Sequence, residues 1–397
     1  MITNLKNKNK KYTVGIVETV IMLLIVCLAS FYAGLSLNNS KNKDGEKKDI
    51  YLERFKENYN YILDNYYKKI DKNKLIDDAI AGMMEALDDP YSVYLDKNDS
   101  NSLNISLSGG YKGLGFAISK NEDGNIIVVS VFDNSPASQA GIVIGDIITQ
   151  INDKNVSEMS INDFSSYVID GDIEDFELTV KRGENLEKIN IKKNNITIDS
   201  VSSDVIEKNG KKIGYLYISV FASNTASQFN KKLIELEKSN IDSLIIDVRD
   251  NTGGYLTTVQ SILEKLLTKE QIIYQLKTNK NVSKVYGKAP KNKKYSIYLL
   301  GNEKSASASE LLISSIKENL NSKFVGKKTF GKGTVQEMVS ISDEKNYKIT
   351  TKKWLTPKGH WINETKGIVP DYDVSNDNSE EDSQLEKIIE LINNEEK

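Results

Sequence analysis

Two short stretches of the chain bring together the residue types that acyl-transfer chemistry requires. They are Asp247-Val-Arg-Asp-Asn-Thr-Gly-Gly254 and Gly301-Asn-Glu-Lys-Ser-Ala-Ser-Ala-Ser-Glu310, and each follows a predicted buried strand. In parallel α/β sheets, sites are built at such strand ends. The serines at 305, 307 and 309 begin a predicted helix over 306–319, so each is either a helix cap or a nucleophile. An amide just after a serine at a helix start would face developing negative charge.

A nucleophilic serine needs a base, and the chain offers two kinds. His360 is the single histidine, in a predicted turn after a strand. Lys332 stands between two glycines, which permit close backbone approach and favour a buried, pre-positioned amine. Gln336 lies four residues further on, and on a strand it would share a face with Lys332. The context favours lysine as the base.

The same lysine nearly completes a phosphate-binding loop, Gly326-x-x-x-x-Gly331-Lys332. This interpretation fails because Gly333 stands where a Ser or Thr must ligate magnesium. The following Thr-Val-Gln also predicts a strand, whereas a phosphate-binding loop leads into a helix.

Composition narrows the classes of function further. The chain has 397 residues, one cysteine (Cys27) and one histidine, with 53 basic and 56 acidic side chains and a formal net charge of -3. These counts exclude an internal disulfide, a cysteine zinc site and a multi-histidine metal site. The near balance of charge argues against a broad nucleic-acid surface. We therefore expect no cofactor, no metal and no nucleic-acid partner.

Residues 14–37 form the longest apolar stretch, and Thr19 to Leu37 carries no charge. About 20 apolar residues span a bilayer, whereas the apolar part of a cleaved signal peptide has about 7–15. The length favours a retained transmembrane anchor over a signal peptide. Lysines on the two sides are nearly equal in number, so the positive-inside rule gives little direction. We expect residues 1–13 in the cytoplasm and the bulk of the chain outside it, since no second span returns it.

The soluble remainder is predicted to begin with a linker and helical lead-in over 38–106, followed by a β-rich block over 107–195. Short strands are predicted at 115–118, 126–131, 147–151, 177–181 and 187–191. The ordered set Tyr-Lys-Gly-Leu-Gly-Phe at 111–116, Asn-Ser-Pro-Ala-Ser-Gln-Ala-Gly at 134–141 and Ile-Gly-Asp-Ile-Ile at 144–148 resembles a PDZ domain.

A PDZ domain adds a peptide to the edge of its sheet. The resemblance implies that the amides of Leu114, Gly115 and Phe116, after Gly113, hold the terminal carboxylate of a peptide. Candidate walls of the side-chain pocket are Phe116, Ile118 and Val168. Arg182 is the only arginine in the block and is our candidate for a relay from bound peptide to the Lys332–Gln336 region.

Residues 196–375 alternate strand and helix, which indicates an α/β layer with parallel strands. The predicted elements are strands at 213–220, 243–248 and 296–300, helices at 225–239, 256–267 and 306–319, and further strands between 334 and 354. Residues 376–397 are acidic and polar, with a short helix predicted over 383–394. This tail is either solvated or a dimerisation contact, so a homodimer is among the partners considered.

The motifs taken in order resemble the carboxyl-terminal processing proteases over residues 50–375. They are Leu-Asp-Asp-Pro-Tyr-Ser-Val-Tyr at 87–94, the PDZ block, Asp-Val-Arg-Asp-Asn-Thr-Gly-Gly, Ser-Ala-Ser-Ala-Ser-Glu and Thr-Phe-Gly-Lys-Gly-Thr-Val-Gln. The resemblance implies a crotonase/Clp-protease-like α/β core with an inserted PDZ domain. By motif match, Ser307 would be the nucleophile, Lys332 the general base and Gln336 the residue that orients the lysine.

The resemblance also implies an oxyanion hole from the amide of Ala308 and one glycine amide of Gly253 and Gly254, of which we favour Gly254. The chain departs from the family at Thr252, where proline is usual, and this bears only on the rigidity of that loop.

The predicted function is that of a single-pass membrane serine endopeptidase with an extracytoplasmic catalytic domain. It would recognise proteins by their free C-termini and cut peptide bonds through an acyl-enzyme. The alternative is a catalytically silent PDZ-bearing membrane adaptor. An acyl-transfer enzyme of the crotonase type is a third candidate, against which the anchor and the PDZ block argue.

Overall fold

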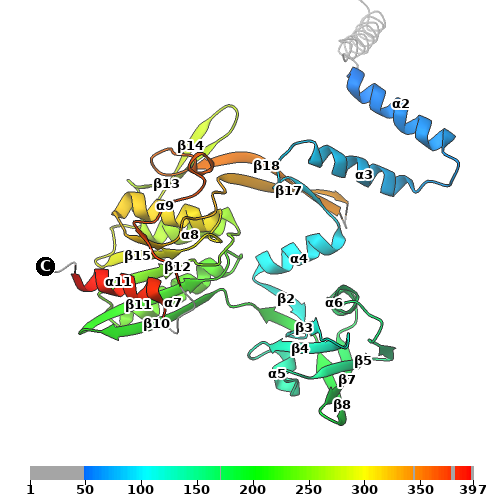
Figure 1. Cartoon of the computed structure of the whole chain (residues 1–397), viewed down its shortest axis with the longest axis horizontal. Helices are drawn as coiled ribbons and strands as arrows, with labels where there is room; N and C mark the ends of the chain where they lie inside the picture. The colour runs from blue at the N-terminus through cyan, green and yellow to red at the C-terminus, as the bar shows by residue number, and fades with distance from the viewer. Residues whose placement is uncertain (1–48, 170, 343–344, 377–380, 395–397) are drawn as a thin grey trace, which may run out of the picture. The chain divides into compact units, whose positions relative to one another are not determined.

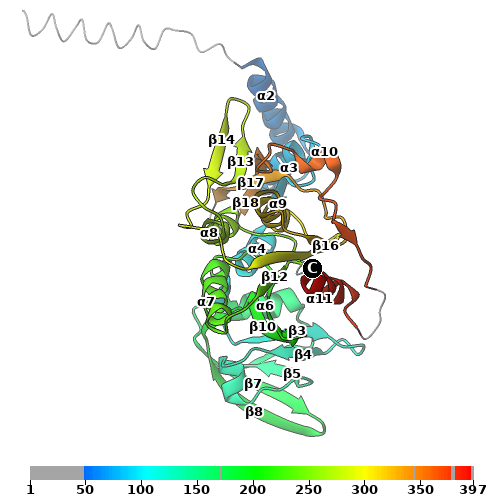
Figure 2. The same cartoon turned by 90° about the vertical axis from the view of Figure 1, so that its left-hand side faces the viewer.

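The computed structural model describes residues 49–169, 171–342, 345–376 and 381–394 (Figures 1 and 2). Its contacts divide the chain into two units, residues 1–79 and 80–397, which are described separately. The predicted anchor at 14–37 lies outside the described residues. Within the described ranges, no helix combines the length and apolar character that a membrane span requires.

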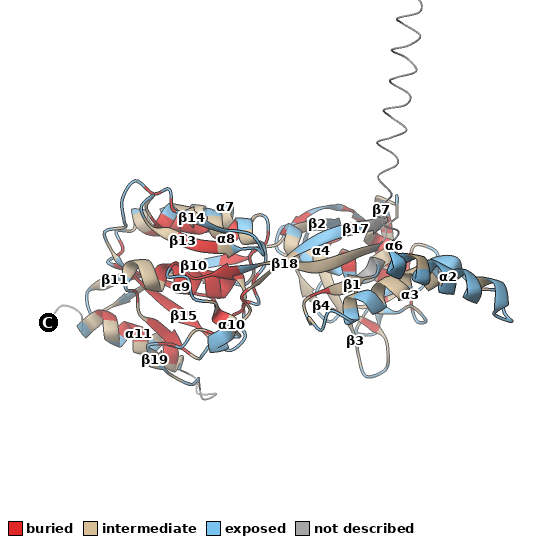
Figure 3. Ribbon diagram, turned by 90° about the horizontal axis from the view of Figure 1, so that it is seen from above, coloured by how far each residue is buried: buried red, intermediate tan, exposed pale blue. Residues whose placement is uncertain are grey.

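The first unit contains helix α2 (Ile50–Asn65) and the start of helix α3 (Lys72–Glu85). The carboxylate of Asp49 accepts a hydrogen bond from the N–H of Tyr51 and so caps α2. The helical lead-in predicted within residues 38–106 is therefore confirmed. No residue of α2 is buried, and Figure 3 shows the helix as exposed along its length.

In the second unit, helix α4 (Lys97–Ser108) precedes the β-rich block. The sequence analysis did not predict this helix. The block itself is an antiparallel sheet in the order β3-β4-β5-β7-β8, and β3 is an edge strand. Its strands are β3 (Phe116–Lys120), β4 (Ile126–Val131), β5 (Ile147–Ile151), β7 (Asp175–Arg182) and β8 (Asn185–Lys192), with β6 (Lys154–Asn155) beside β5. Helices α5 (Pro136–Ala140) and α6 (Ile161–Ile169) complete the block. The chain enters it through β2 (Gly110–Gly113) and leaves it through β9 (Asn194–Thr197), which pair with each other.

The core of the second unit is a sheet in the order β10-β11-β12-β15-β16-β19. Only the β10–β11 pair is antiparallel, and the other neighbours are parallel. The strands are β10 (Val201–Lys208), β11 (Lys211–Ile218), β12 (Ser243–Asp247), β15 (Ser296–Gly301), β16 (Phe324–Gly326) and β19 (Tyr372–Asp373). The predicted α/β layer with parallel strands is confirmed.

Side-chain alternation gives this sheet two apolar faces. Leu244 and Ile246 of β12 pack with helices α7 (Thr225–Lys238), α8 (Leu256–Leu266) and α9 (Ala308–Leu320). Ile245, between them in sequence, belongs to the apolar cluster of the opposite face. All five residues of β12 are buried, as expected for a parallel strand covered on both sides.

The opposite face is covered by helix α11 (Ser383–Asn394), which corrects the interpretation of the acidic tail. Ile388, Ile389 and Ile392 of α11 are buried in one cluster with Ile245 and Leu300 of the sheet. The helix predicted over 383–394 is confirmed, and its apolar side completes the core. Residues 383–394 are therefore part of the folded core and not a solvated tail, and the dimer contact stays a prediction.

A second sheet of the same unit is antiparallel, with β18 at its centre. Its strands are β1 (Val93–Leu95), β13 (Ile272–Lys277), β14 (Val282–Tyr286), β17 (Thr334–Ser342) and β18 (Lys345–Leu355). The short helix α10 (Ile362–Thr365) follows β18. Strand β17 starts two residues after Lys332, so this sheet positions the predicted base.

Candidate active site

The structure gives the three serines at 305, 307 and 309 different environments. The hydroxyl of Ser305 donates to the carbonyl of Val248 at 2.7 Å, and that of Ser309 donates to the carbonyl of Asn251 at 2.7 Å. Both side chains are buried, so both serve to hold the 248–251 loop. Ser307 is partly exposed and lines a cavity of about 460 Å³. Only Ser307 of the three is therefore accessible to a substrate.

Ser307 also has an unusual backbone conformation. Its φ is +54°, a region that residues other than glycine rarely occupy. Helix α9 starts at the next residue, Ala308, two residues later than the sequence predicted. The serine thus stands on a sharp turn at the helix start, and the amide of Ala308 belongs to the first turn of the helix.

The 251–254 loop lies directly against this turn. A Cβ atom on Gly253 would stand 2.9 Å from the carbonyl oxygen of Ala306, and one on Gly254 would stand 2.3 Å from that of Phe221. Both glycines have positive φ, so neither position tolerates a side chain. The N–H of Gly253 donates to the side chain of Asn251 at 2.8 Å, which favours Gly254 as the predicted oxyanion donor.

Asn251 also compensates for the missing proline at position 252. Its side chain is fully buried and donates to the carbonyl of Ile218 at 2.9 Å, while its carbonyl accepts from the N–H of Ala306 at 3.0 Å. These bonds fix the loop from both sides, so its rigidity does not depend on Thr252.

The loop that carries Lys332 is fixed through its backbone. The indole N–H of Trp354 donates to the carbonyl of Lys332 at 3.1 Å, and that of Trp361 donates to the carbonyl of Gly333 at 2.9 Å. A Cβ atom on Gly331 would lie 2.8 Å from the backbone of Gly367. The flanking glycines are therefore required by close packing, as the sequence context suggested.

The side chain of Lys332 is largely buried and lines the same cavity as Ser307. Its Nζ lies 4.6 Å from the centre of the Tyr91 ring, and within the described residues it has no hydrogen bond or ion pair. Burial lowers the pKa of Lys332 from its ordinary 10.5 to about 8, assisted by the nearby charge of Lys348. Asp89 and Glu310 oppose this shift without reversing it.

Glu310 ties the serine turn to the lysine loop, and the sequence analysis gave it no role. Its carboxylate accepts hydrogen bonds from the backbone N–H groups of Ser307 at 2.8 Å and Lys332 at 2.9 Å. The N–H of Gly331 and the hydroxyl of Thr329 donate to its other oxygen, each at 2.6 Å. Burial raises the pKa of Glu310, and these four donors stabilise the charged form against that effect.

Gln336 lines the cavity, but its amide does not reach Lys332. The Nε2 group donates to the hydroxyls of Thr334 at 2.9 Å and Thr350 at 3.0 Å. The pairing of β17 with β18 shifts register between Val335 and Gln336. The extra residue at this irregularity, Thr351, is on β18, and Gln336 and Lys332 both line the cavity of Ser307, so the role that their even spacing suggested stays a prediction.

His360 lies in the exposed turn between β18 and α10 and is absent from the residues that line the cavity of Ser307. Its backbone pairs with Thr356. The structure therefore does not bring the single histidine to the predicted nucleophile. No group of three or more His, Cys, Asp or Glu side chains among the described residues could hold a metal ion.

Comparison with known proteins identifies the family to which this chain belongs. The family model described as "Peptidase family S41" matches residues 212–374. The carboxy-terminal processing protease CtpB of Bacillus subtilis (strain 168) is 37% identical over 327 residues, which cover 82% of this chain and 68% of the relative. CtpA of the same organism is 33% identical over 356 residues, covering 88% and 75%. The chain belongs to the carboxy-terminal processing proteases.

Other parts of the chain agree with this membership. Residues 127–182 match the PDZ domain model, and residues 24–99 match the model described as "Activating protease CtpB N-terminal domain". A solved structure from Bacteroides fragilis NCTC 9343, assigned to the S41 proteases, superposes with a TM-score of 0.50 at 16% identity. That match covers 83% of this chain and 91% of the solved one and shows the fold alone. The chain is thus a serine-type peptidase of this family with a PDZ domain.

In the PDZ block of this carboxy-terminal processing protease, the predicted peptide-binding residues lie at the end of β2 and along β3. Phe116 and Ile118 lie on the edge strand β3, and the Phe116 ring lies 6.4 Å from that of Phe164 in helix α6. Leu114 is buried, and Gly115 has a φ of +89°, so the predicted strand begins only at Phe116. Gly113 ends β2 and packs against the ring of Tyr111.

Arg182 has its partners within the PDZ block. Its guanidinium donates to both carboxylate oxygens of Asp146 at 2.8 Å and to the carbonyl of Gly141 at 2.8 Å, and it also pairs with Glu187. Within the described residues, these contacts hold the 141–146 turn and link it to strand β8, all within the PDZ block. The proposed relay to Lys332 and Gln336 therefore has no contact that carries it.

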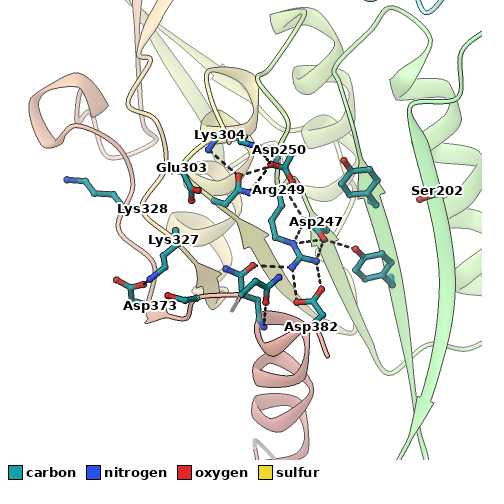
Figure 4. A pocket seen from close by; sticks show the side chains of 16 residues that line it. Ser202, Asp247, Arg249, Asp250, Glu303, Lys304, Lys327, Lys328, Asp373 and Asp382 are labelled. Atoms are coloured by element: carbon teal, nitrogen blue, oxygen red, sulfur yellow. Dashed lines mark hydrogen bonds and ion pairs between the residues drawn. The ribbon is translucent and has the colours of Figure 1, made fainter. Parts of the chain in front are cut away.

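A second and larger cavity of about 1180 Å³ lies at the carboxyl ends of the parallel strands, and Figure 4 shows its lining. Arg249 is held there between two carboxylates, those of Asp247 and Asp382, with N–O distances of 2.6 and 2.7 Å. Asp382 directly precedes helix α11, and Arg249 directly precedes the 250–254 loop. The C-terminal helix and the predicted oxyanion loop are thereby joined through one guanidinium.

Sequence reasoning missed Glu310, Tyr91 and the two tryptophans because each acts through a partner far along the chain. Glu310 could have been noticed from its position alone, since a Glu three residues after a serine at a helix start is typical of a capping box. Nothing local marked Tyr91 as a neighbour of Lys332, which stands 241 residues later.

Proposed function

We propose that this protease hydrolyses peptide bonds with Ser307 as nucleophile and Lys332 as general base. The observation that carries the proposal is the amine of Lys332, which is buried at the wall of the Ser307 cavity without a charged partner. With its pKa lowered to about 8, about a tenth of the amine is neutral at pH 7, and only the neutral amine accepts a proton.

The chemistry would proceed in two halves. Lys332 takes the proton of the Ser307 hydroxyl as Oγ attacks the carbonyl carbon, and the resulting ammonium then protonates the leaving amine as the C–N bond breaks. A water, deprotonated by Lys332, next attacks the ester of Ser307, and the ammonium returns the proton to Ser307 Oγ as the C–O bond breaks and the acid is released. In the structure no hydrogen bond joins Lys332 Nζ and Ser307 Oγ, and such bonds often form only when substrate is bound.

Backbone amides would stabilise the tetrahedral oxyanion. The amide of Ala308, at the start of α9, is one donor, and the amide of Gly254 is the other, since that of Gly253 is engaged by Asn251. Gln336 would orient Lys332, for which its amide must leave the hydroxyls of Thr334 and Thr350.

The PDZ block would select substrates by their free C-terminus. Strand β3 is an edge strand, so its backbone is available to pair with an extended peptide beside helix α6. The amides of 114–116 at the start of β3 would bind the terminal carboxylate, with Phe116 and Ile118 contacting the last side chain.

Residues 14–37 would anchor the enzyme in the cell membrane, with the catalytic unit outside the cytoplasm. The uncharged run from Thr19 to Leu37 supports this proposal. N-terminal sequencing of the membrane-bound protein tests it, because a cleaved signal would leave a chain that begins after the apolar run. A homodimer stays a proposal, supported by the exposed apolar side chains of α2, such as Tyr51, Leu52 and Phe55.

The experiment that tests the proposed function compares the full chain with its Ser307→Ala variant. Both are incubated with an unfolded protein such as reduced casein, and the cut sites are mapped by mass spectrometry. The peptidase predicts cuts that the variant cannot make. A silent PDZ-bearing adaptor predicts binding of the protein without any cut.

A further inference from the structure

The segment just before α4 lies beside the predicted base, although it is distant in sequence. Strand β1 pairs with β18, with Val93 opposite Lys348. The hydroxyl of Ser92 accepts the N–H of Thr350 at 3.0 Å, and Ser92 in turn donates to Asp89 at 2.6 Å. These bonds fasten the 89–93 turn to the sheet that carries the Lys332 loop.

The same turn directs the ring of Tyr91 at the base. The carboxylate of Asp89 accepts the N–H of Tyr91 at 3.1 Å, which fixes the backbone that carries the ring. The ring centre stands 4.6 Å from Lys332 Nζ, a normal distance for an ammonium over an aromatic face. The phenol hydroxyl has no hydrogen bond within the described residues, so the ring face is the part of Tyr91 that the structure uses.

We propose that Tyr91 is a positioning residue for the general base, and that its ring holds the amine of Lys332 in place and keeps water from it. An aromatic face restrains an ammonium but accepts no proton and forms no ordinary hydrogen bond with it. A carboxylate would stabilise the charged amine, and water would do the same.

The direction of the effect follows from this difference. Water solvates an ammonium better than a ring face does, so removing the ring favours the charged form and raises the pKa of Lys332 toward 10.5. The other charged groups near the amine stay in place, namely Asp89 and Glu310, which raise the pKa, and Lys348, which lowers it. Below its pKa the neutral fraction of the amine then falls, and the rate falls with it.

The test measures rate against pH for the full chain, Tyr91→Phe and Tyr91→Leu. Two readouts are used between pH 6 and 10: hydrolysis of a short fluorogenic peptide, and covalent modification of Ser307 by a fluorophosphonate. Tyr91→Phe keeps the ring and should match the parent within about twofold. Tyr91→Leu should raise the apparent pKa by about one unit, which lowers kcat about tenfold at pH 7 and restores it at high pH, with KM unchanged. Tyr91→Met provides a second ringless side chain if the leucine variant does not fold.

Three results would overturn the proposal: an unchanged pKa in a folded ringless variant, an equal loss in Tyr91→Phe, or a higher rate without the ring. The last would mean that the ring sequesters the amine away from Ser307. The proposal rests on the proposed function, and Lys332→Ala distinguishes the two. Activity in that variant contradicts the dyad itself, whereas a dead Lys332→Ala with a normal Tyr91→Leu contradicts only the role of the ring.

Discussion

The backbone N–H of Lys332 donates a hydrogen bond of 2.9 Å to the carboxylate of Glu310. Glu310 is fully buried in the first turn of α9, and the same carboxylate accepts the N–H of Ser307 at 2.8 Å. One side chain therefore fixes the backbones of the proposed nucleophile and the proposed base. Ser307 and Lys332, which are 25 residues apart in the sequence, are thereby held in a fixed arrangement at the same cavity.

Glu310→Gln should lower kcat by about 100-fold or more while the chain stays folded. The amide keeps the shape of the carboxylate, but its NH₂ group turns a donor toward backbone N–H groups and leaves at least one unpaired, at a cost of about 1–3 kcal/mol. Peptide hydrolysis and urea unfolding measure the two effects. Glu303→Gln, an exposed change in the turn that precedes α9, is the matched control, and equal activity in both variants would remove the role given to Glu310.

Replacing the base should stabilise the fold. The pKa of Lys332 is about 8 in the folded chain and near 10.5 when unfolded, so protonation favours the unfolded state. This penalty is fully present below pH 8 and disappears as the pH rises from 8 to 10.5. Lys332→Met should therefore raise the free energy of unfolding at pH 7 by about 1–3 kcal/mol, with the gain gone near pH 10.5. A pH-independent difference would show that the buried amine is not its source.

Helix α11 should contribute to the stability of the core. Ile389 is buried against the sheet, so Ile389→Ala should lower the free energy of unfolding by about 2–4 kcal/mol. Asn394→Ala, at the exposed end of the same helix, should change it by less than about 0.5 kcal/mol. Denaturant unfolding measures the free energy of unfolding of both variants. Similar values for the two would show that residues 383–394 do not stabilise the core.

Peptides with a free C-terminus should be cut faster than their amidated counterparts. The amides at 114–116 supply backbone donors for a carboxylate, and losing its charge should weaken binding by about 1–3 kcal/mol. Matched pairs of peptides that differ only in this end are compared by cleavage rate. Phe116→Gln should reduce the difference between the two ends while leaving very short peptides unaffected. If free and amidated peptides are cut equally fast by the parent chain, the PDZ block does not recognise the terminus.

Local patterns predicted much of the fold. Strands β4 and β5 were predicted to the residue, because turn residues bound each apolar run on both sides. The parallel layer followed from alternating strands and helices, and the accessible serine followed from a motif. What local patterns did not predict was packing against distant parts of the chain. The helix over 383–394 was predicted, but not the packing of its isoleucines against the sheet, and no local signal indicated that Gln336 donates to Thr334 and Thr350.

The central claim, that Lys332 is the base of Ser307, is tested most directly by the pH dependence of Ser307 modification with a fluorophosphonate. The rate in the full chain should rise with pH through a value near 8, and His360→Ala should reproduce the same curve. Lys332→Ala and Lys332→Arg should both be unreactive, since arginine does not deprotonate. An inflection near 6.5 that disappears in His360→Ala, with reactivity retained in Lys332→Ala, would contradict the account and assign the proton transfer to the histidine.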